Sequence, residues 1–169
     1  MANTYQLIEA KTLSSNATSV TFSSIPATYT DLQFVCSVRC ADGAYGNYFV
    51  YFNATGNASS KVLSGDGAAA SSASGYGPAT YLTMGTLNSA GQTANTFNSA
   101  SVYIPNYASS NFKSISVENV TETNATTAYA QINAGLWSST SAINTLVIYA
   151  DGSNMVQYST FYLYGIKNS

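Results

Sequence analysis

Few residues in this chain could do chemistry, and a pair of carboxylates is the first to consider. Glu118 and Glu122 are four positions apart, so in a strand their side chains would share a face. Paired carboxylates are the groups that glycoside cleavage uses as acid, base or nucleophile. The alternative is that both are solvated side chains at the end of a strand. We favour this alternative and predict no catalytic residue and no enzyme activity.

Nucleophilic and metal chemistry have even less support. The chain has no histidine, which excludes a Ser-His-Asp triad, a Cys-His pair and most zinc sites. Cys36 and Cys40 share one apolar run, and in a strand they would lie roughly 13 Å apart, at about 3.3 Å per residue. That is too far for a disulfide, so we expect two small core residues. We predict no cofactor and no metal site.

The composition explains why the chain has so few candidate catalytic groups. Only 12 of the 169 residues are charged, 5 basic and 7 acidic, whereas 60 are serine, threonine or asparagine. Hydroxyl and amide groups suit half-buried strands and tight turns. The hydrophobic fraction is 46%, which is normal for a folded domain, so the low charge does not indicate disorder. This composition is typical of a β-rich structural or binding module.

The charge distribution excludes several partners. The five basic residues are scattered, and nucleic-acid binding needs clustered cations to neutralise phosphates, so we expect no nucleic-acid partner. Residues 1–6 have neither the basic nor the apolar region of a secretory signal. No apolar stretch approaches the length of a membrane span, so we predict that the protein does not insert into a membrane. We also predict that it is synthesised in a cytoplasm.

The apolar residues recur with a period of two, which is the pattern of strands. Between residues 32 and 40, for example, leucine, phenylalanine, cysteine and valine occupy the even-numbered positions. Asp-Gly pairs at 42–43 and 151–152 are strong turn signals, because glycine accepts positive φ. About ten strands are predicted, at residues 5–10, 18–22, 32–40, 48–53, 79–84, 96–104, 112–120, 127–136, 143–149 and 156–166.

Many short strands with regular turns indicate a sandwich or a barrel. We predict an all-β, antiparallel, two-sheet β-sandwich, jelly-roll-like, formed by residues 1–169 as one domain. Residues 65–78 are mostly Gly, Ala and Ser and are expected to be a flexible loop. Residues 48–53 are continuously apolar and should be buried on both faces or covered by a partner chain. The apolar C-terminal strand must lie inside a sheet or against a subunit.

Aromatic residues in glycine-rich or polar surroundings are the candidate contact residues. Most of the 22 aromatic side chains should fill the core. Tyrosine and tryptophan also present large, rigid surfaces at low entropic cost, which suits protein contacts or sugar stacking. Four of them are predicted at an interface, with core packing as the alternative: Tyr45, Tyr76, Tyr107 and Trp137.

Five segments resemble small structural proteins of tailed phages that infect cyanobacteria and marine bacteria. They are LIEAKTLSS at 7–15, VTFSSIPATYTDL at 20–32, SVYIPNY at 101–107, AGLW at 134–137 and STFYLYGIK at 159–167. The resemblance runs over nearly the whole chain and is weakest at about 41–91. It implies a β-sandwich in the virion, assembled in the host cytoplasm, and it transfers no catalytic residue.

The resemblance implies two functions. One is a capsid decoration (cement) protein that stabilises the head by binding the major capsid protein and copies of itself, with a homotrimer expected. The other is a tail or tail-fibre component that recognises host-surface carbohydrate, for which Tyr76 and Trp137 are the candidate stacking residues. A low net charge of −2 tolerates the close packing of an assembly.

Overall fold

The structure is a computed structural model that describes residues 4–74, 80–125 and 127–167. These residues form thirteen strands and no helix, which confirms the predicted all-β class. In chain order the strands are β1 (Tyr5–Thr12), β2 (Ser19–Phe22), β3 (Asp31–Ser37), β4 (Arg39–Cys40), β5 (Gly46–Phe52), β6 (Ala58–Gly65), β7 (Ala70–Ser74), β8 (Leu82–Ser89), β9 (Ser99–Ile104), β10 (Lys113–Val120), β11 (Ala130–Trp137), β12 (Leu146–Ala150) and β13 (Thr160–Ile166).

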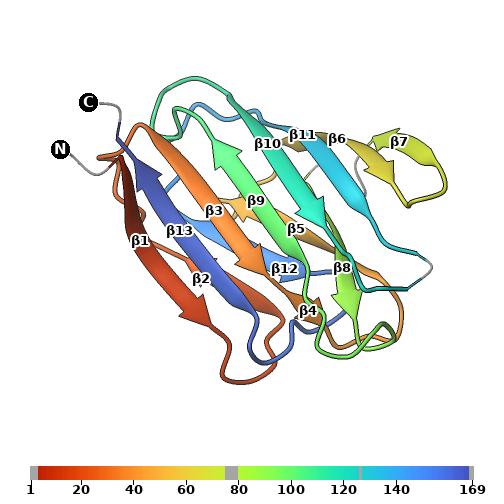
Figure 1. The fold of residues 1–169 in the computed structure, drawn as a ribbon. Coiled ribbons are helices and arrows are strands. Elements are labelled where there is room, and N and C mark those ends of the chain that lie inside the picture. The colour runs from red at the N-terminus through yellow and green to blue at the C-terminus, as the bar shows by residue number, and fades with distance from the viewer. Residues whose placement is uncertain (1–3, 75–79, 126, 168–169) are drawn as a thin grey trace.

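The strands form two sheets that pack face to face as a β-sandwich (Figure 1). The larger sheet has eight strands in the order β1-β13-β3-β9-β10-β11-β6-β7, and the smaller has five in the order β2-β12-β5-β8-β4. All neighbouring pairs are antiparallel except β4 and β8, which are parallel. Aromatic contacts join the layers, with the rings of Phe22 and Phe34 5.9 Å apart and those of Phe52 and Trp137 5.6 Å apart.

Two strands have no counterpart among the ten predicted ones. β6 and β7 were missed because their sequences, ASSKVLSG and ASSAS, are rich in serine and alanine and show no alternation of large apolar residues. A third difference is the division of the strand predicted at 32–40 into β3 and β4. The strand breaks at Val38, whose N–H donates to the Asn98 side chain at 2.7 Å instead of to a neighbouring strand.

The segment predicted as a flexible loop, 65–78, is partly a strand. Its residues Ala70–Ser74 form β7 and pair with β6 in a regular register from Gly65↔Ala70 to Lys61↔Ser74. The connecting turn is closed by the Asp66 N–H, which donates to the Ala69 carbonyl at 3.2 Å. This corrects the prediction for these residues, because pairing with β6 orders a sequence with little strand propensity of its own. Residues 75–78 lie outside the described residues.

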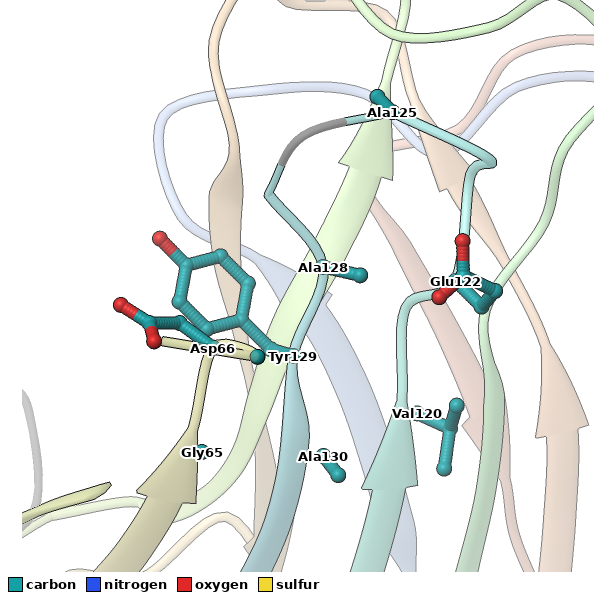
Figure 2. Close-up of a pocket in the computed structure, with 9 residues that line it drawn as sticks. Gly65, Asp66, Val120, Glu122, Ala125, Ala128, Tyr129 and Ala130 are labelled. Atoms are coloured by element: carbon teal, nitrogen blue, oxygen red, sulfur yellow. The ribbon is translucent and has the colours of Figure 1, made fainter. Parts of the chain in front are cut away.

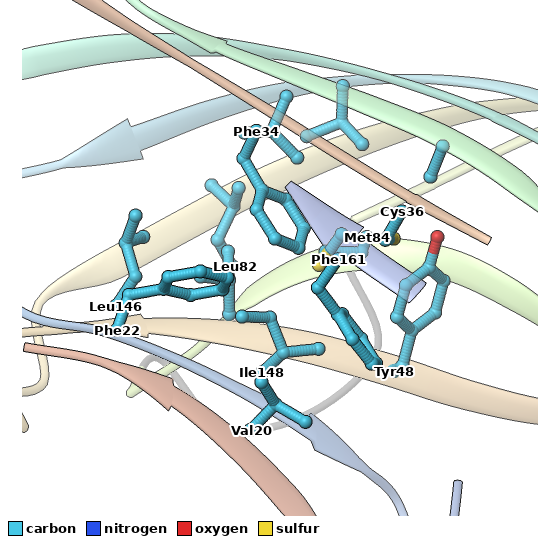
Figure 3. Close-up of a cluster of buried hydrophobic side chains, with 14 of the residues drawn as sticks. Val20, Phe22, Phe34, Cys36, Tyr48, Leu82, Met84, Leu146, Ile148 and Phe161 are labelled. Carbon is cyan, nitrogen blue, oxygen red and sulfur yellow. The ribbon is translucent and has the colours of Figure 1, made fainter. Parts of the chain in front are cut away.

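The core lies between the two sheets and is built from alternate side chains of facing strands (Figure 3). Phe22 of β2 and Phe34 of β3 meet at its centre, and Phe161 of β13 stacks on Phe34 at 6.5 Å. Ile148 and Leu82 approach from the smaller sheet. Full burial of each such side chain contributes about 1.5–3 kcal/mol relative to exposure, so this cluster holds the two sheets together.

The apolar run 48–53 is covered by the protein itself. Tyr48 and Val50 of β5 face the core and are buried. Phe49 points the other way and is also buried, because the Tyr81 ring lies 5.3 Å from its own. The prediction of a strand buried on both faces is therefore confirmed for residues 48–50, whereas Tyr51 on the outer face is half-buried.

Two further predictions are confirmed. The apolar C-terminal strand β13 lies between β1 and β3, inside the larger sheet. Cys36 and Cys40 are both free and buried, and burial raises the pKa of the Cys36 thiol to about 12. Among the described residues, no helix is long and apolar enough to cross a membrane.

Candidate binding surface

Four aliphatic side chains are exposed on the outer face of the larger sheet. They are Leu63 of β6, Val120 of β10, and Ile132 and Leu136 of β11, with 55%, 47%, 60% and 37% of their surface exposed. Leu63 and Ile132 are direct partners across the β6–β11 pair, and Val120 pairs with the neighbouring Ala130. Leu136 lies four residues further along β11, about 13 Å from Ile132. We call these four residues the aliphatic patch. Single exposed apolar residues are common, whereas several on one face indicate a contact surface.

The aliphatic patch exists because the first part of β11 buries amides and exposes an aliphatic residue, whereas the end of the strand buries Trp137 in the usual way. Its amide residues Gln131 and Asn133 point into the sandwich and are 5% and 1% exposed, whereas Ile132 between them points outward. Neighbouring β10 likewise buries Asn119 at its end and exposes Val120. Polar side chains facing inward beneath aliphatic ones facing outward are the reverse of the usual arrangement.

The inward amides are hydrogen-bonded to the backbone of β8, although Asn133 Oδ1 is buried without a hydrogen-bond partner among the described residues. Asn119 donates through Nδ2 to the Thr86 carbonyl at 2.8 Å, and Gln131 Oε1 accepts the Thr86 N–H at 2.8 Å. Asn133 donates through Nδ2 to the Thr83 carbonyl at 3.1 Å. Buried polar groups are tolerated when they are hydrogen-bonded in this way. The sandwich therefore has a polar layer under the aliphatic patch.

The polar layer extends into the smaller sheet through Tyr48. Its hydroxyl donates to Asn119 Oδ1 at 2.9 Å and accepts from Asn98 Nδ2 at 2.7 Å. Burial raises the pKa of Tyr48 well above 10, so the ring stays neutral and able to donate. A register slip by one residue would turn these amides out and the aliphatic residues in, breaking every bond of the layer. The hydrogen bonds thus fix the outward position of Ile132.

A shallow hollow of about 340 Å³ lies at one end of the aliphatic patch, between the β6–β7 turn and the β10–β11 connection (Figure 2). Asp66 and Glu122 lie on its two sides, with Tyr129 beside Asp66. Its other walls are small and apolar, with Ala128 and Val120 among them. An aromatic ring between carboxylate acceptors could bind a ligand that offers hydroxyl donors and an apolar face.

Backbone hydrogen bonds hold the two carboxylates of the hollow in place. Asp66 Oδ1 accepts the N–H groups of Ala69 at 2.7 Å and Ala68 at 2.9 Å, and these bonds lower the pKa of the Asp66 carboxyl. Glu122 Oε1 accepts the Asn124 N–H at 2.6 Å. Asp66 is half-buried and Glu122 is exposed, so each carboxylate stays in contact with solvent while one oxygen is fixed.

Of the predicted contact residues, Tyr45 does not line the hollow but contacts Tyr129, which does. Its ring meets the Tyr129 ring edge-on at 5.2 Å, with the planes at 85°, and its hydroxyl donates to the Thr127 carbonyl at 2.6 Å. Tyr45 is half-buried and supports Tyr129 from the side. Tyr76 lies outside the described residues.

Tyr107 and Trp137 lie in the core, which corrects the expectation that they contribute to an interface. Tyr107 is fully buried, and its hydroxyl donates to the Pro26 carbonyl. Trp137 is 1% exposed and packs between the Phe52 ring and the Lys113 ammonium, which is 5.3 Å from its centroid. Their polar sequence neighbours belong to connections that fold back over the sandwich. Polar residues nearby in the sequence therefore did not indicate that the two aromatic side chains are exposed.

The candidate catalytic groups are not assembled into a site. Glu118 lies on the open sheet face opposite Ile132, whereas Glu122 lies in the hollow. Ser110 and Lys113 have the spacing of a serine–lysine nucleophile motif. The buried Lys113 ammonium, however, donates to three backbone carbonyls, at 2.5–3.2 Å. The described residues contain no cluster of three or more His, Cys, Asp or Glu that could hold a metal.

Reasoning from the sequence missed the aliphatic patch, because it assigned every alternating apolar residue to the core. The available signal was the pair of amides at alternate positions of β11, Gln131 and Asn133, on either side of Ile132. Comparison with protein-family models and with curated proteins finds no match.

Proposed function

We propose that this protein is a non-enzymatic structural protein of a tailed-phage virion, a capsid decoration protein that binds the major capsid protein through the aliphatic patch. The finer description of the sandwich as jelly-roll-like belongs to the same proposal. The observation that carries it is the patch itself, aliphatic side chains held outward over a polar layer. Each of these side chains would contribute about 1.5–3 kcal/mol on full burial against a partner, and many symmetry-related copies would add up.

The surroundings of the aliphatic patch favour a protein partner. Only two charged side chains, Lys61 and Glu118, stand on the outer face of β6, β10 and β11. A flat face with few ions can be desolvated at low cost, since buried unpaired ions are strongly unfavourable. The serine side chains around the patch can form hydrogen bonds with a partner.

The copy number of the protein in purified particles tests this proposal. Quantitative mass spectrometry would give its ratio to the major capsid protein. We expect a ratio near one or a simple fraction of it, because a decoration protein follows the symmetry of the shell. A few copies per particle would contradict the capsid assignment and favour a tail component. Complete absence would contradict both.

A pair of matched variants tests the role of the aliphatic patch. Ile132→Asn replaces the most exposed member of the patch, and Leu7→Asn replaces a leucine that is equally exposed as Leu63, but on β1 at the far edge of the sheet. We expect Ile132→Asn to weaken attachment to particles that lack the protein by about 10-fold or more, because one apolar anchor is lost. Leu7→Asn should attach normally. Equal attachment of both variants would exclude the aliphatic patch as the surface that binds the particle.

A second candidate function, a tail or tail-fibre component that recognises carbohydrate, is favoured by the hollow in Figure 2. Tyr129 would stack on a sugar ring, and Asp66 and Glu122 would accept its hydroxyl protons. No basic side chain lines the hollow, so neutral sugars fit better than acidic ones. On a glycan array, Tyr129→Ala should abolish any signal, whereas Tyr158→Ala, which removes an exposed tyrosine elsewhere, should not. No signal for the wild-type protein would end this alternative.

A further inference from the structure

The two sheets have four edges, and edges are where β proteins pair with other chains unless something prevents it. The larger sheet ends at β1 and β7, and the smaller ends at β2 and β4. Natural proteins block edges with charges, bulges, very short strands or covering segments.

The β1 edge is blocked by charge and by a bulge. Its pairing with β13 shifts register between Leu7 and Glu9. Glu9 and Lys11 form an ion pair at 2.6 Å, and the Lys11 ammonium lies 5.3 Å from the centre of the Phe22 ring in the other sheet. A bulge together with a lysine turned toward the sandwich is a recognised barrier to edge pairing.

The two edges of the smaller sheet are short or covered. β4 has two residues, and the segment at 154–156 runs along it, with the Ala41 N–H donating to Asn154 and the Val156 N–H donating to the Arg39 carbonyl. β2 has four residues and is continued by a bridge from Ala17 to Met155. Neither offers a long free strand.

Among the described residues, the β7 edge carries none of these devices. Its five residues, Ala70–Ser74, are alanine and serine only, and its register with β6 is regular over the whole length. The nearest ammonium, that of Lys61, donates to Ser74 Oγ at 2.7 Å on the outer face of the sheet. It therefore lies above the plane in which a new strand would pair. We infer that β7 pairs antiparallel with β7 of a second copy of this chain.

The side chains of β7 favour its own copy as the partner. Strand addition gains affinity from the backbone and selectivity from side-chain pockets. Alanine and serine form no such pockets, so the edge has little means of selecting a foreign sequence. Pairing two copies also brings no like charges together within the strand, because β7 has none.

Charge complementarity at the two ends of the strand points to the same partner. A two-fold axis through Ser72, the middle residue of β7, places Ala70 of one copy opposite Ser74 of the other. Asp66 binds the turn that leads into Ala70, and Lys61 is bonded to Ser74. Each end of the paired strands then brings an acidic group of one copy toward a basic group of the other, twice by symmetry.

Cysteine cross-linking tests this pairing. In the proposed dimer Ser72 faces its own copy with Cα atoms about 4.5–5.5 Å apart, within disulfide range. Ser72→Cys should form a disulfide-linked dimer on mild oxidation at least 10-fold faster than Ala10→Cys, a control on the blocked β1 edge. The native thiols should not interfere, since both are buried and have raised pKa values.

Two further measurements fix the register and the symmetry. Ala70→Cys and Ser74→Cys should each cross-link poorly alone but well when mixed, because residue 70 faces residue 74 of the other copy. Lys61→Glu should slow the Ser72→Cys cross-link by about 2- to 10-fold, as expected for exposed ion pairs, and adding Asp66→Lys should restore it. Native mass spectrometry should show dimers, in contrast to the homotrimer that the resemblance implies.

The inference is overturned if Ser72→Cys cross-links no faster than Ala10→Cys, or if the wild-type protein forms only monomers or trimers at high concentration. Circular dichroism on each variant distinguishes lost pairing from lost folding. Because the test measures self-association alone, its failure would leave the proposed attachment through the aliphatic patch untouched. A protein that forms the β7 dimer but does not attach to particles would support the pairing of β7 and contradict the proposed attachment through the aliphatic patch.

Discussion

The two halves of the eight-stranded sheet differ in what they bury beside their apolar residues. In the half that ends at β1, Phe34 and Phe161 point into the sandwich, and Leu7 is exposed at the edge. In the half that ends at β7, Val117 and Trp137 also point inward, but so do the amides of the polar layer, and the aliphatic patch faces out. The polar layer holds this patch outward, so the half at β7 is where we expect binding.

The edges of the two halves differ in the same sense. β1 has a bulge and an ion pair, whereas β7 has neither and is a regular strand of small uncharged residues. Protection against unwanted pairing is thus present on β1 and missing from β7, beside the aliphatic patch.

Truncating a core residue of each half should give unequal losses of stability. Phe34→Ala should lower the free energy of unfolding by about 4 kcal/mol, because a ring packed against Phe22 and Phe161 leaves a cavity. Asn119→Ala should cost about 2 kcal/mol, since its partners lose hydrogen bonds but water can replace some of them. Urea unfolding measures both. A larger loss for Asn119→Ala would mean that the polar layer dominates.

The polar layer can be broken from β8. Gly85 has φ +123°, and a Cβ there would lie 2.6 Å from Gln131 Oε1 and 2.7 Å from Asn119 Nδ2. Gly85→Ala should therefore cost about 3 kcal/mol from backbone strain and displaced hydrogen bonds. Gly67, with φ +89° and open space around it, is the matched control and should cost about 1 kcal/mol. Equal losses would show that the layer tolerates displacement.

Alkaline pH should loosen the polar layer. The folded pKa of Tyr48 lies well above 10, and the unfolded value is near 10. Its contribution to stability is therefore complete below about pH 10 and declines above it, by about 1.4 kcal/mol per pH unit. Tyr48→Phe should flatten this slope by one proton in unfolding titrations between about pH 10 and 11. An unchanged slope would contradict the assignment of a neutral, buried hydroxyl.

Removing a guard of the β1 edge should change association more than stability. Lys11→Ala should alter the free energy of unfolding by no more than about 0.5 kcal/mol, because the ion pair with Glu9 is partly exposed and screened by solvent. It should nevertheless increase light scattering at high protein concentration, since a barrier to edge pairing is lost. Lys167→Ala removes the same charge without touching this ion pair and is the control. Equal light scattering by Lys11→Ala and Lys167→Ala would mean that the bulge alone prevents pairing at the β1 edge.

How much of this could be predicted from the sequence depends on the strand. β3, β5 and β13 were predicted because large apolar residues alternate or run together in them, and burial follows directly. β8 was predicted too early in the chain, at 79–84, because its later buried residues include Asn88 and Ser89, which look exposed in a sequence. β6 and β7 form because they pair with neighbouring strands, and this pairing cannot be recognised from their own sequences.

The candidate site was even less accessible from the sequence. Whether Ile132 or Gln131 faces the core is decided by one residue of register, and that register is set by hydrogen bonds to Thr86, 45 residues away. Tyr45 was identified as a contact residue, yet the ring it supports, Tyr129, was not. The hollow is formed by two connections that are far apart in the chain, so its residues show no characteristic sequence spacing.

The most direct test of the central claim is a side-chain footprint of the protein, free and attached to particles. Hydroxyl-radical labelling followed by mass spectrometry would report the solvent exposure of each aliphatic side chain. The account predicts strong protection of Leu63, Val120, Ile132 and Leu136 in the attached protein, and an unchanged Leu7 on the opposite edge. Protection of Leu7 with continued labelling of the aliphatic patch would show that the protein binds by its other half, and would contradict the account.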